Sequence, residues 1–274
     1  MQHYFVRALL GLVLLLGIAP AGAHEFWLDP VDFTPKVGAR VPVLWRNGMN
    51  FLGDSYPYER KWSKRFSVFD ARGERQIKAT PGDDPAADVP FPTPGLAIVV
   101  FQRAPDTLDY KSLDQFLAFL LDEGLDDLAA RYRATPNAPQ NLQEVYTRYA
   151  KTLLAVGSTA GEDKPVGLPL EIVVETNPYA RPPGTPVIAR VLEAGRAVAN
   201  VQVKMFNRPP GNGSGLEPRR LRTDAEGRVR IEGLVAGEVL LNATTMKPVA
   251  PLAADIGLQT RWESQWATVT FRAP

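Results

Sequence analysis

Short runs of branched and aromatic residues, separated by clusters of Gly, Pro and Asp, constrain this chain to a mainly β fold. Before residue 105 the runs are Arg40–Trp45, Arg65–Asp70 and Leu96–Gln102. After residue 165 they are Leu170–Val174, Val187–Leu192, Val201–Phe206, Arg228–Glu232, Val239–Thr244 and Ala267–Phe271. Strands of this length and spacing are typical of β-sandwiches. The sequence predicts two β-sandwich domains, at 24–105 and 161–274, joined by a short helical insertion.

The middle segment, 106–160, has a different hydrophobic period. Ser112-Leu113-Asp114-Gln115 fits a capping box, and the apolar residues after it recur every three or four positions: Leu113, Phe116, Leu117, Leu120 and Leu121. A second helix is predicted from Asn141, with one apolar face: Leu142, Val145, Tyr149, Leu153 and Val156. We interpret both as helices packed on a β core rather than as a partner-binding groove.

Other residues are predicted to have structural roles. The segment from Thr223 to Gly227 has the composition of a hairpin turn. The aromatic side chains of the last run are expected to fill a core: Trp262, Trp266 and Phe271. Two groups are expected to supply packing and solvated charge. These are Tyr146, Arg148, Tyr149 and Lys151 on the predicted second helix, and the acidic pairs Asp122-Glu123 and Asp126-Asp127.

The first 23 residues have the order of a secretory signal peptide. Arg7 ends a short positive region, Ala8 to Pro20 form an apolar run, and Ala21-Gly22-Ala23 is a small-residue cleavage site. The run is short for a membrane span, and no later stretch approaches the roughly 18 apolar residues that a spanning helix needs. We therefore expect a periplasmic protein with no membrane span after cleavage behind Ala23. The alternative for this segment is an amino-terminal anchor.

Composition narrows the chemistry of the mature chain. The absence of cysteine excludes disulfides, thiolate zinc sites and thiol catalysis. Loss of the signal removes Arg7 and leaves 30 of the 31 basic residues against 30 acidic ones, a balance that argues against nucleic acid or an anionic membrane surface as partner. His3 departs with the signal, so any imidazole chemistry depends on His24, the first mature residue.

Longer segments carry two family resemblances. The segment from Thr185 to Met246 resembles transthyretin-like modules that also occur as regulatory domains of carboxypeptidases. More of the chain resembles a bacterial periplasmic domain-of-unknown-function family described as the periplasmic component of nickel or cobalt uptake. The segments that carry this second resemblance span the mature chain: His24–Leu28, Gly48–Tyr58, Tyr146–Gly157, Val166–Tyr179 and Trp262–Phe271.

The second resemblance implies a transition-metal site, for Ni(II) or Co(II) and secondarily Cu(II), and an inner-membrane metal-uptake transporter as partner. The α-amine and Nδ1 of an amino-terminal His24 can chelate one metal ion. Two nitrogens are too few for a tight site, so carboxylates or thioethers must complete it. The candidates are Glu25, Asp29, Asp54, Glu263, Met49 and Met246. Relatives often have a His where Thr245 stands, and a hydroxyl is a poor ligand for these metals.

Two hypotheses from different classes follow. The first is a non-enzymatic metal-binding accessory protein of nickel or cobalt uptake that uses His24 and nearby carboxylates. The alternative is a structural or interaction module of the envelope that binds a protein or glycan without metal. An oxidative copper enzyme built around His24 is a third possibility, disfavoured because such centres normally recruit further imidazoles.

Overall fold

The computed structural model describes residues 25–138, 142–182, 184–249 and 260–274. His24 and the signal segment lie outside this part of the chain. In order, the elements are β1 (Glu25–Pro30), β2 (Arg40–Met49), β3 (Leu52–Tyr56), η1 (Arg60–Trp62), β4 (Ser63–Asp70), β5 (Gly73–Gln76), β6 (Ala87–Pro90), β7 (Gly95–Arg103), β8 (Asp106–Asp109), α1 (Leu113–Asp122), α2 (Asp126–Ala134), β9 (Gln143–Val156), β10 (Leu170–Val174), β11 (Val187–Glu193), β12 (Arg196–Ala197), β13 (Gln202–Arg208), β14 (Arg219–Arg222), β15 (Arg228–Ile231), β16 (Gly237–Pro248) and β17 (Thr260–Ala273). No helix among the described residues is long and apolar enough to cross a membrane.

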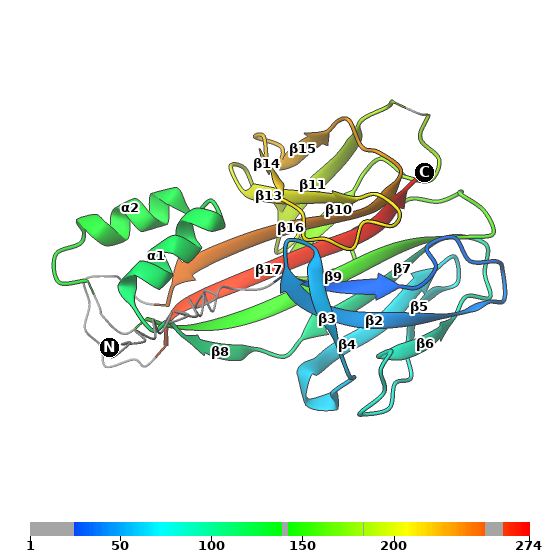
Figure 1. Cartoon of the computed structure of the whole chain (residues 1–274), viewed down its shortest axis with the longest axis horizontal. Helices are drawn as coiled ribbons and strands as arrows, with labels where there is room; N and C mark the ends of the chain where they lie inside the picture. The colour runs from blue at the N-terminus through cyan, green and yellow to red at the C-terminus, as the bar shows by residue number, and fades with distance from the viewer. Residues whose placement is uncertain (1–24, 139–141, 183, 250–259) are drawn as a thin grey trace, which may run out of the picture.

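One long sheet passes through the whole molecule (Figure 1). Its strands run in the order β14-β13-β16-β17-β9-β7-β4-β5, and β8 also pairs with β9. Strands β9 and β17 are each 14 residues long and pair in parallel, whereas the other described ladders of this sheet are antiparallel. The parallel pair joins an amino-terminal half to a carboxy-terminal half.

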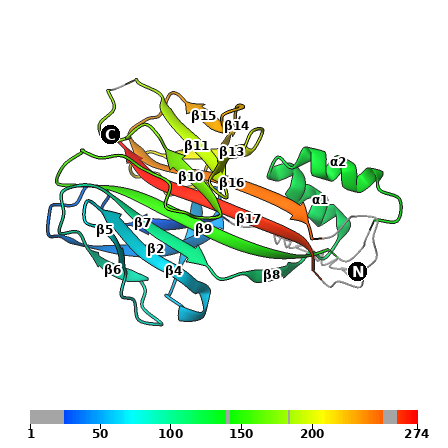
Figure 2. The ribbon, with the colours of Figure 1, turned by 180° about the vertical axis from the view of Figure 1, so that it is seen from behind.

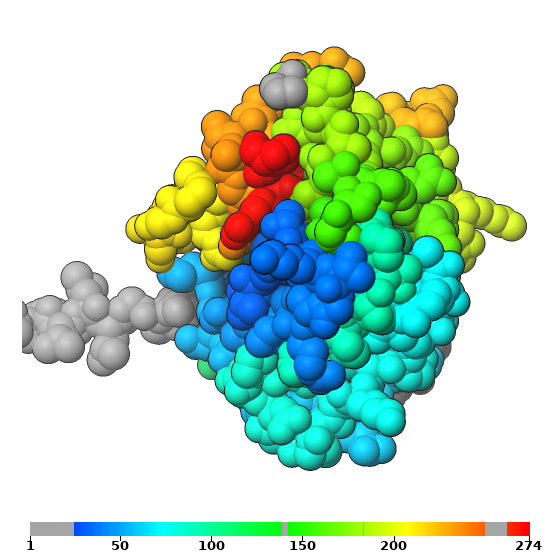
Figure 3. Space-filling model, turned by 90° about the vertical axis from the view of Figure 1, so that its right-hand side faces the viewer, coloured from blue at the N-terminus to red at the C-terminus, as the bar shows by residue number. Residues whose placement is uncertain are grey.

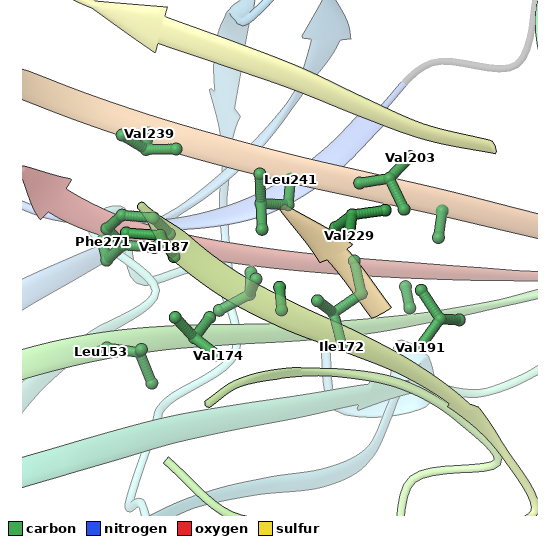
Figure 4. Close-up of a cluster of buried hydrophobic side chains, with 14 of the residues drawn as sticks. Leu153, Ile172, Val174, Val187, Val191, Val203, Val229, Val239, Leu241 and Phe271 are labelled. Atoms are coloured by element: carbon green, nitrogen blue, oxygen red, sulfur yellow. The ribbon is translucent and has the colours of Figure 1, made fainter. Parts of the chain in front are cut away.

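A smaller sheet, β10-β11-β12 with β15 paired to β11, covers one face of the carboxy-terminal half. Successive residues of a strand point to opposite faces, and the odd-numbered side chains of β13, β16 and β17 point to this one. They form an apolar core with the small sheet, in which Val203, Leu241 and Phe271 face Ile172 and Val187 (Figure 4). This layer is a β-sandwich.

The opposite face of the long sheet carries two separate covers. The sheet β1-β2-β3, with β6 paired to β2, packs on β4, β7 and β9 through Phe26, Trp45, Phe66 and Phe101. Helices α1 and α2 cover the other end of the long sheet, as Figures 1 and 2 show, where Phe116 packs on Trp262 and Phe119 on Trp266.

The backbone of strand β1 is hydrogen-bonded to side chains on the face of the long sheet. The Thr268 and Thr270 hydroxyls of β17 donate hydrogen bonds of 2.7 Å to the carbonyls of Phe26 and Leu28. The amino-terminal strands therefore lie beside the carboxy-terminal end of the chain, which Figure 3 shows as blue against red.

The mainly β fold with two sandwiches and a short helical insertion is confirmed, and each of the nine predicted runs lies on a strand. The first helix is also confirmed: Ser112 caps α1 by accepting a hydrogen bond from the Gln115 amide. Trp262, Trp266 and Phe271 are buried, as predicted.

The helix predicted from Asn141 is wrong, because 143–156 forms strand β9. From Tyr149 onward β9 is buried on both faces, since it lies in the middle of a covered sheet. A strand buried on both sides loses the two-residue alternation that identifies strands, and its apolar positions then match a helical spacing by chance. Lys151, predicted to be solvated, is fully buried on this strand.

The hairpin predicted at 223–227 is only partly correct. The segment does form a tight turn, with Gly227 at φ +75° and its amide bonded to the Asp224 carbonyl. However, β14 before it pairs with β13 in the long sheet, whereas β15 after it pairs with β11 in the small sheet. The turn therefore connects the two layers of the sandwich.

Candidate functional site

A buried cluster of charged side chains lies where β1, α1 and the long sheet meet. Lys204 on β13 is at its centre, and its Nζ lies 2.5 Å from both Asp122 Oδ2 and Glu123 Oε1 at the end of α1. Glu25, the first residue of β1, places Oε1 3.8 Å from the same nitrogen. Lys204 therefore contacts both the front of β1 and the end of α1.

The long sheet supplies the floor of the cluster. Lys204, Asn242 and Thr268 are register partners on adjacent strands, so they form one row across the even-numbered face. Glu123 Oε2 accepts a 2.7 Å hydrogen bond from the neighbouring Thr244 hydroxyl. Glu123 is thus a buried structural carboxyl, and its predicted place on a solvated surface is wrong.

The charges in this cluster perturb one another. Burial raises the pKa of Glu25 to about 7, although the Lys204 ammonium opposes that shift. Burial also raises the pKa of Glu123. At Asp122 desolvation works in the same direction, but hydrogen bonds from Lys204 and Arg220 outweigh it and lower the pKa. Three carboxyls face two cations, Lys204 and Arg220, so the fully ionised cluster carries one excess negative charge.

Two buried oxygens at this site have no hydrogen-bond partner: Glu25 Oε2 and Asn242 Oδ1. Glu25 is 4 % exposed and Asn242 is 1 % exposed, so bulk water does not satisfy them. Leaving such acceptors unpaired costs about 1–3 kcal/mol each. Glu25 Oε2 can therefore bind a proton or a cation.

The other predicted ligands lie elsewhere. Asp29 is four residues along β1, about 13 Å from Glu25 at the usual strand rise, and its carboxylate accepts a 2.9 Å hydrogen bond from Arg46. Asp54 is exposed on β3, where it pairs in register with Asn47. Among the residues that the structure describes, no three His, Asp or Glu side chains are grouped as a metal site.

His24, the predicted principal ligand, lies outside the described residues. Its covalent bond to Glu25 nevertheless fixes the spacing, because consecutive Cα atoms are about 3.8 Å apart. Of the predicted carboxylate ligands, Glu25 is therefore the one that the chain itself holds next to His24.

Thr245 lies on the opposite face of the long sheet. Its hydroxyl donates a 3.3 Å hydrogen bond to Glu193 on β11 and lines a cavity of about 120 Å³ together with Met246, Glu263 and Gln265. Glu263 also pairs with Lys247 at 3.3 Å, and Met49 is exposed at the tip of the β2–β3 hairpin. A site that used position 245 would be separated from Glu25 by the sheet.

Sequence reasoning missed Lys204 and the role of Glu123. In Val201–Phe206 the polar positions Gln202 and Lys204 alternate with apolar ones, which is the pattern of a strand with one solvated face. That face is instead covered by α1 and β1. The cover comes from segments 80 or more residues away in the sequence, so no local signal marks it.

The model of a family described as "Domain of unknown function (DUF4198)" matches residues 21–247. No curated protein matches the sequence. Among solved structures, the D0-D1 domain of Intimin aligns with 90% of this chain and 97% of its own length, at 11% identity and a TM-score of 0.20. That score is too low to assign a fold, so the fold described above is based on its own strands and registers.

Proposed function

The chain belongs to the DUF4198 family, a family defined by a domain of unknown function, and from that premise we propose that the mature protein is a non-enzymatic metal-binding accessory protein of the periplasm. Its cargo would be Ni(II) or Co(II), held at the front of β1 by the amine and imidazole of His24 and by the Glu25 carboxylate. An inner-membrane uptake transporter would be the receiving partner.

The observation that supports this proposal is the unpartnered Glu25 oxygen. Glu25 follows His24 directly, is buried, and has one carboxylate oxygen without a hydrogen bond beside a cluster in which three carboxyls face two cations. Amine and imidazole nitrogens with one carboxylate oxygen suit borderline divalent metals. Asp29 and Asp54 have no part in the proposal, because one is paired with Arg46 and the other is exposed on β3.

The pKa of Glu25 determines how such a site depends on pH. Burial holds that pKa at about 7, so a metal at neutral pH must displace a proton from Glu25 as well as from the His24 amine. Affinity should therefore fall as the pH drops below about 7, through the titration of Glu25 and of the imidazole.

Titration calorimetry with Ni(II) on protein that begins at His24 tests the proposal. Near-stoichiometric binding is expected. His24→Ala and a single Gly added before His24 should each remove most of the affinity, because either change breaks the amine–imidazole chelate. Glu25→Gln should weaken binding about tenfold, because the substitution removes the carboxylate that binds the metal.

Asp54→Asn is the matched control, since it removes a predicted ligand from the same sheet without touching the cluster. Its affinity should equal that of the wild type. Tight binding that survives both the Gly extension and Glu25→Gln would place the metal elsewhere and refute the site.

A second candidate function, the interaction module, is favoured by one specific feature. Strand β3 is an outer strand of its sheet, and the β2–β3 hairpin exposes three apolar side chains: Met49, Leu52 and Tyr56. Exposed apolar groups on an edge strand are typical of surfaces that pair with another chain. A mature protein that binds none of Ni(II), Co(II) and Cu(II) in the titration would favour this function.

A further inference from the structure

A second buried charged group lies on the other face of the long sheet, away from the candidate metal site. Lys151 of β9 is flanked in register by Val100 and Val269, within the apolar core of the carboxy-terminal sandwich. Its side chain is 1 % exposed, and its two carboxyl partners, Asp163 and Glu171, are 0 % and 2 % exposed. None of these three residues takes part in the proposed function.

The three groups are in direct contact. Lys151 Nζ lies 2.7 Å from Asp163 Oδ1 and 3.1 Å from Glu171 Oε1. The carboxyl carbon of Asp163 is one bond beyond Oδ1, which brings the nitrogen close to the separation of about 3–3.5 Å from which reacting atoms combine. The β9 strand and the backbone around Asp163 hold the pair in place.

Both carboxyls are oriented by backbone amides. Asp163 Oδ2 accepts a 2.8 Å hydrogen bond from the Val174 amide of β10, and Oδ1 accepts one of 2.9 Å from Lys164. Glu171 accepts three, from Val166, Gly167 and Leu168. Amide donors on the oxygen of an attacked carbonyl stabilise the negative charge that develops on it, and Glu171 is held against the Lys151 nitrogen.

We propose that Lys151 and Asp163 condense to an intramolecular isopeptide bond, with Glu171 as the proton carrier. The site is a modification site, and its product is an amide that ties β9 of the long sheet to the segment leading into β10. The chain has no cysteine and so cannot form disulfides. The isopeptide bond would give it a covalent cross-link by another route.

The reaction balances without any added reagent. Glu171 carries one proton from the Lys151 ammonium to Asp163, and the free amine attacks Cγ of the neutral acid to form the C–N bond. One C–O bond of Asp163 then breaks, and its oxygen leaves as water with that proton and a second one that Glu171 carries over from Nζ. The ammonium and carboxylate become an amide and water, and Glu171 is regenerated.

The surroundings favour condensation over a permanent ion pair. Desolvation of a buried ion pair offsets much of its Coulomb attraction, and an amide removes both charges from the apolar core. Burial also raises the pKa of Asp163, against the effect of the Lys151 ammonium, which increases the share of the neutral acid that an amine can attack.

Intact-mass spectrometry of the denatured mature protein tests the proposal directly. The wild type should be lighter than its sequence mass by one water, about 18 Da. Trypsin should fail to cleave after Lys151, so that a peptide beginning at Tyr149 also contains Asp163 and carries the deficit. A wild-type mass equal to the sequence mass would refute the bond without recourse to any variant.

Three variants assign the atoms. Lys151→Arg keeps a cation but has no primary amine, so the deficit should vanish, and a deficit that persists there would overturn the assignment. Asp163→Asn should lose ammonia instead of water, which changes the deficit to about 17 Da. Glu171→Gln should leave most molecules at the full sequence mass, and complete cross-linking in that variant would remove Glu171 from the reaction.

Discussion

Among the single residues, Glu25 is expected to affect both metal binding and the stability of the fold. The same carboxyl that we propose as a ligand lies beside Lys204 and keeps its proton up to nearly neutral pH, because burial raises its pKa from 4.5 to about 7. Between these two values the folded state binds more protons than the unfolded state, so the free energy of unfolding must fall as the pH rises.

A neutral substitution should reveal this effect. The shift corresponds to about 3 kcal/mol, present below pH 4.5 and lost by the time the pH passes about 7. As the pH rises from 4.5 to 7.5, we expect the free energy of unfolding to fall less in Glu25→Gln than in the wild type. Urea unfolding at several pH values in metal-free buffer measures this difference. Asp54→Asn should keep the wild-type slope. Parallel slopes for Glu25→Gln and the wild type would contradict the raised pKa.

At the scale of elements, the turn between β14 and β15 determines how the two layers of the sandwich connect. Gly227 has φ +75°, and a Cβ there would lie 2.9 Å from the Val191 carbonyl and 3.0 Å from the Val198 amide. Gly233 has a similar φ of +64°, but a Cβ there meets nothing within 4 Å. A comparison of the two glycines therefore distinguishes the cost of a positive φ from the cost of a steric clash at Cβ.

Alanine substitutions at these two glycines should differ in cost. Gly233→Ala carries only the positive-φ strain, about 1 kcal/mol. Gly227→Ala has the same strain and also places a Cβ too close to the backbone of Val191 and Val198, which should cost about 1–3 kcal/mol more. Urea midpoints of the two variants provide the measurement, and equal losses would mean that the turn does not pack between the layers as described.

The elements also show what the sequence could and could not predict. Strands with one covered face, such as β2 and β11, keep their alternation and were predicted, as was the capped helix α1. Strands β7 and β10 are also buried on both faces, but their short runs identified them as strands, whereas β9 was missed because its 14 residues have the length of a helix. Lys204 was missed because the elements that bury it come from distant parts of the chain. Glu25 was predicted as one of several groups that could complete a site at His24, but its buried partners could be identified only from the structure.

At the scale of the whole molecule, the parallel pairing of β9 with β17 joins the two sandwiches into one sheet. The threonine hydroxyls that bind β1 come from the last strand, so the first and last strands support each other. We expect the mature protein to unfold in a single transition, with far-UV circular dichroism and tryptophan fluorescence giving the same urea midpoint. Two separated midpoints would mean that the halves fold independently.

A crystal structure of the mature protein grown with Ni(II), with anomalous scattering used to locate the metal, tests the proposed metal site at the front of β1. We expect one anomalous peak within coordination distance of the His24 amine, its imidazole Nδ1 and a Glu25 carboxylate oxygen. A peak beside Thr245 on the opposite face of the sheet, or an ordered His24 with no metal bound to it, would rule out a metal site at the front of β1.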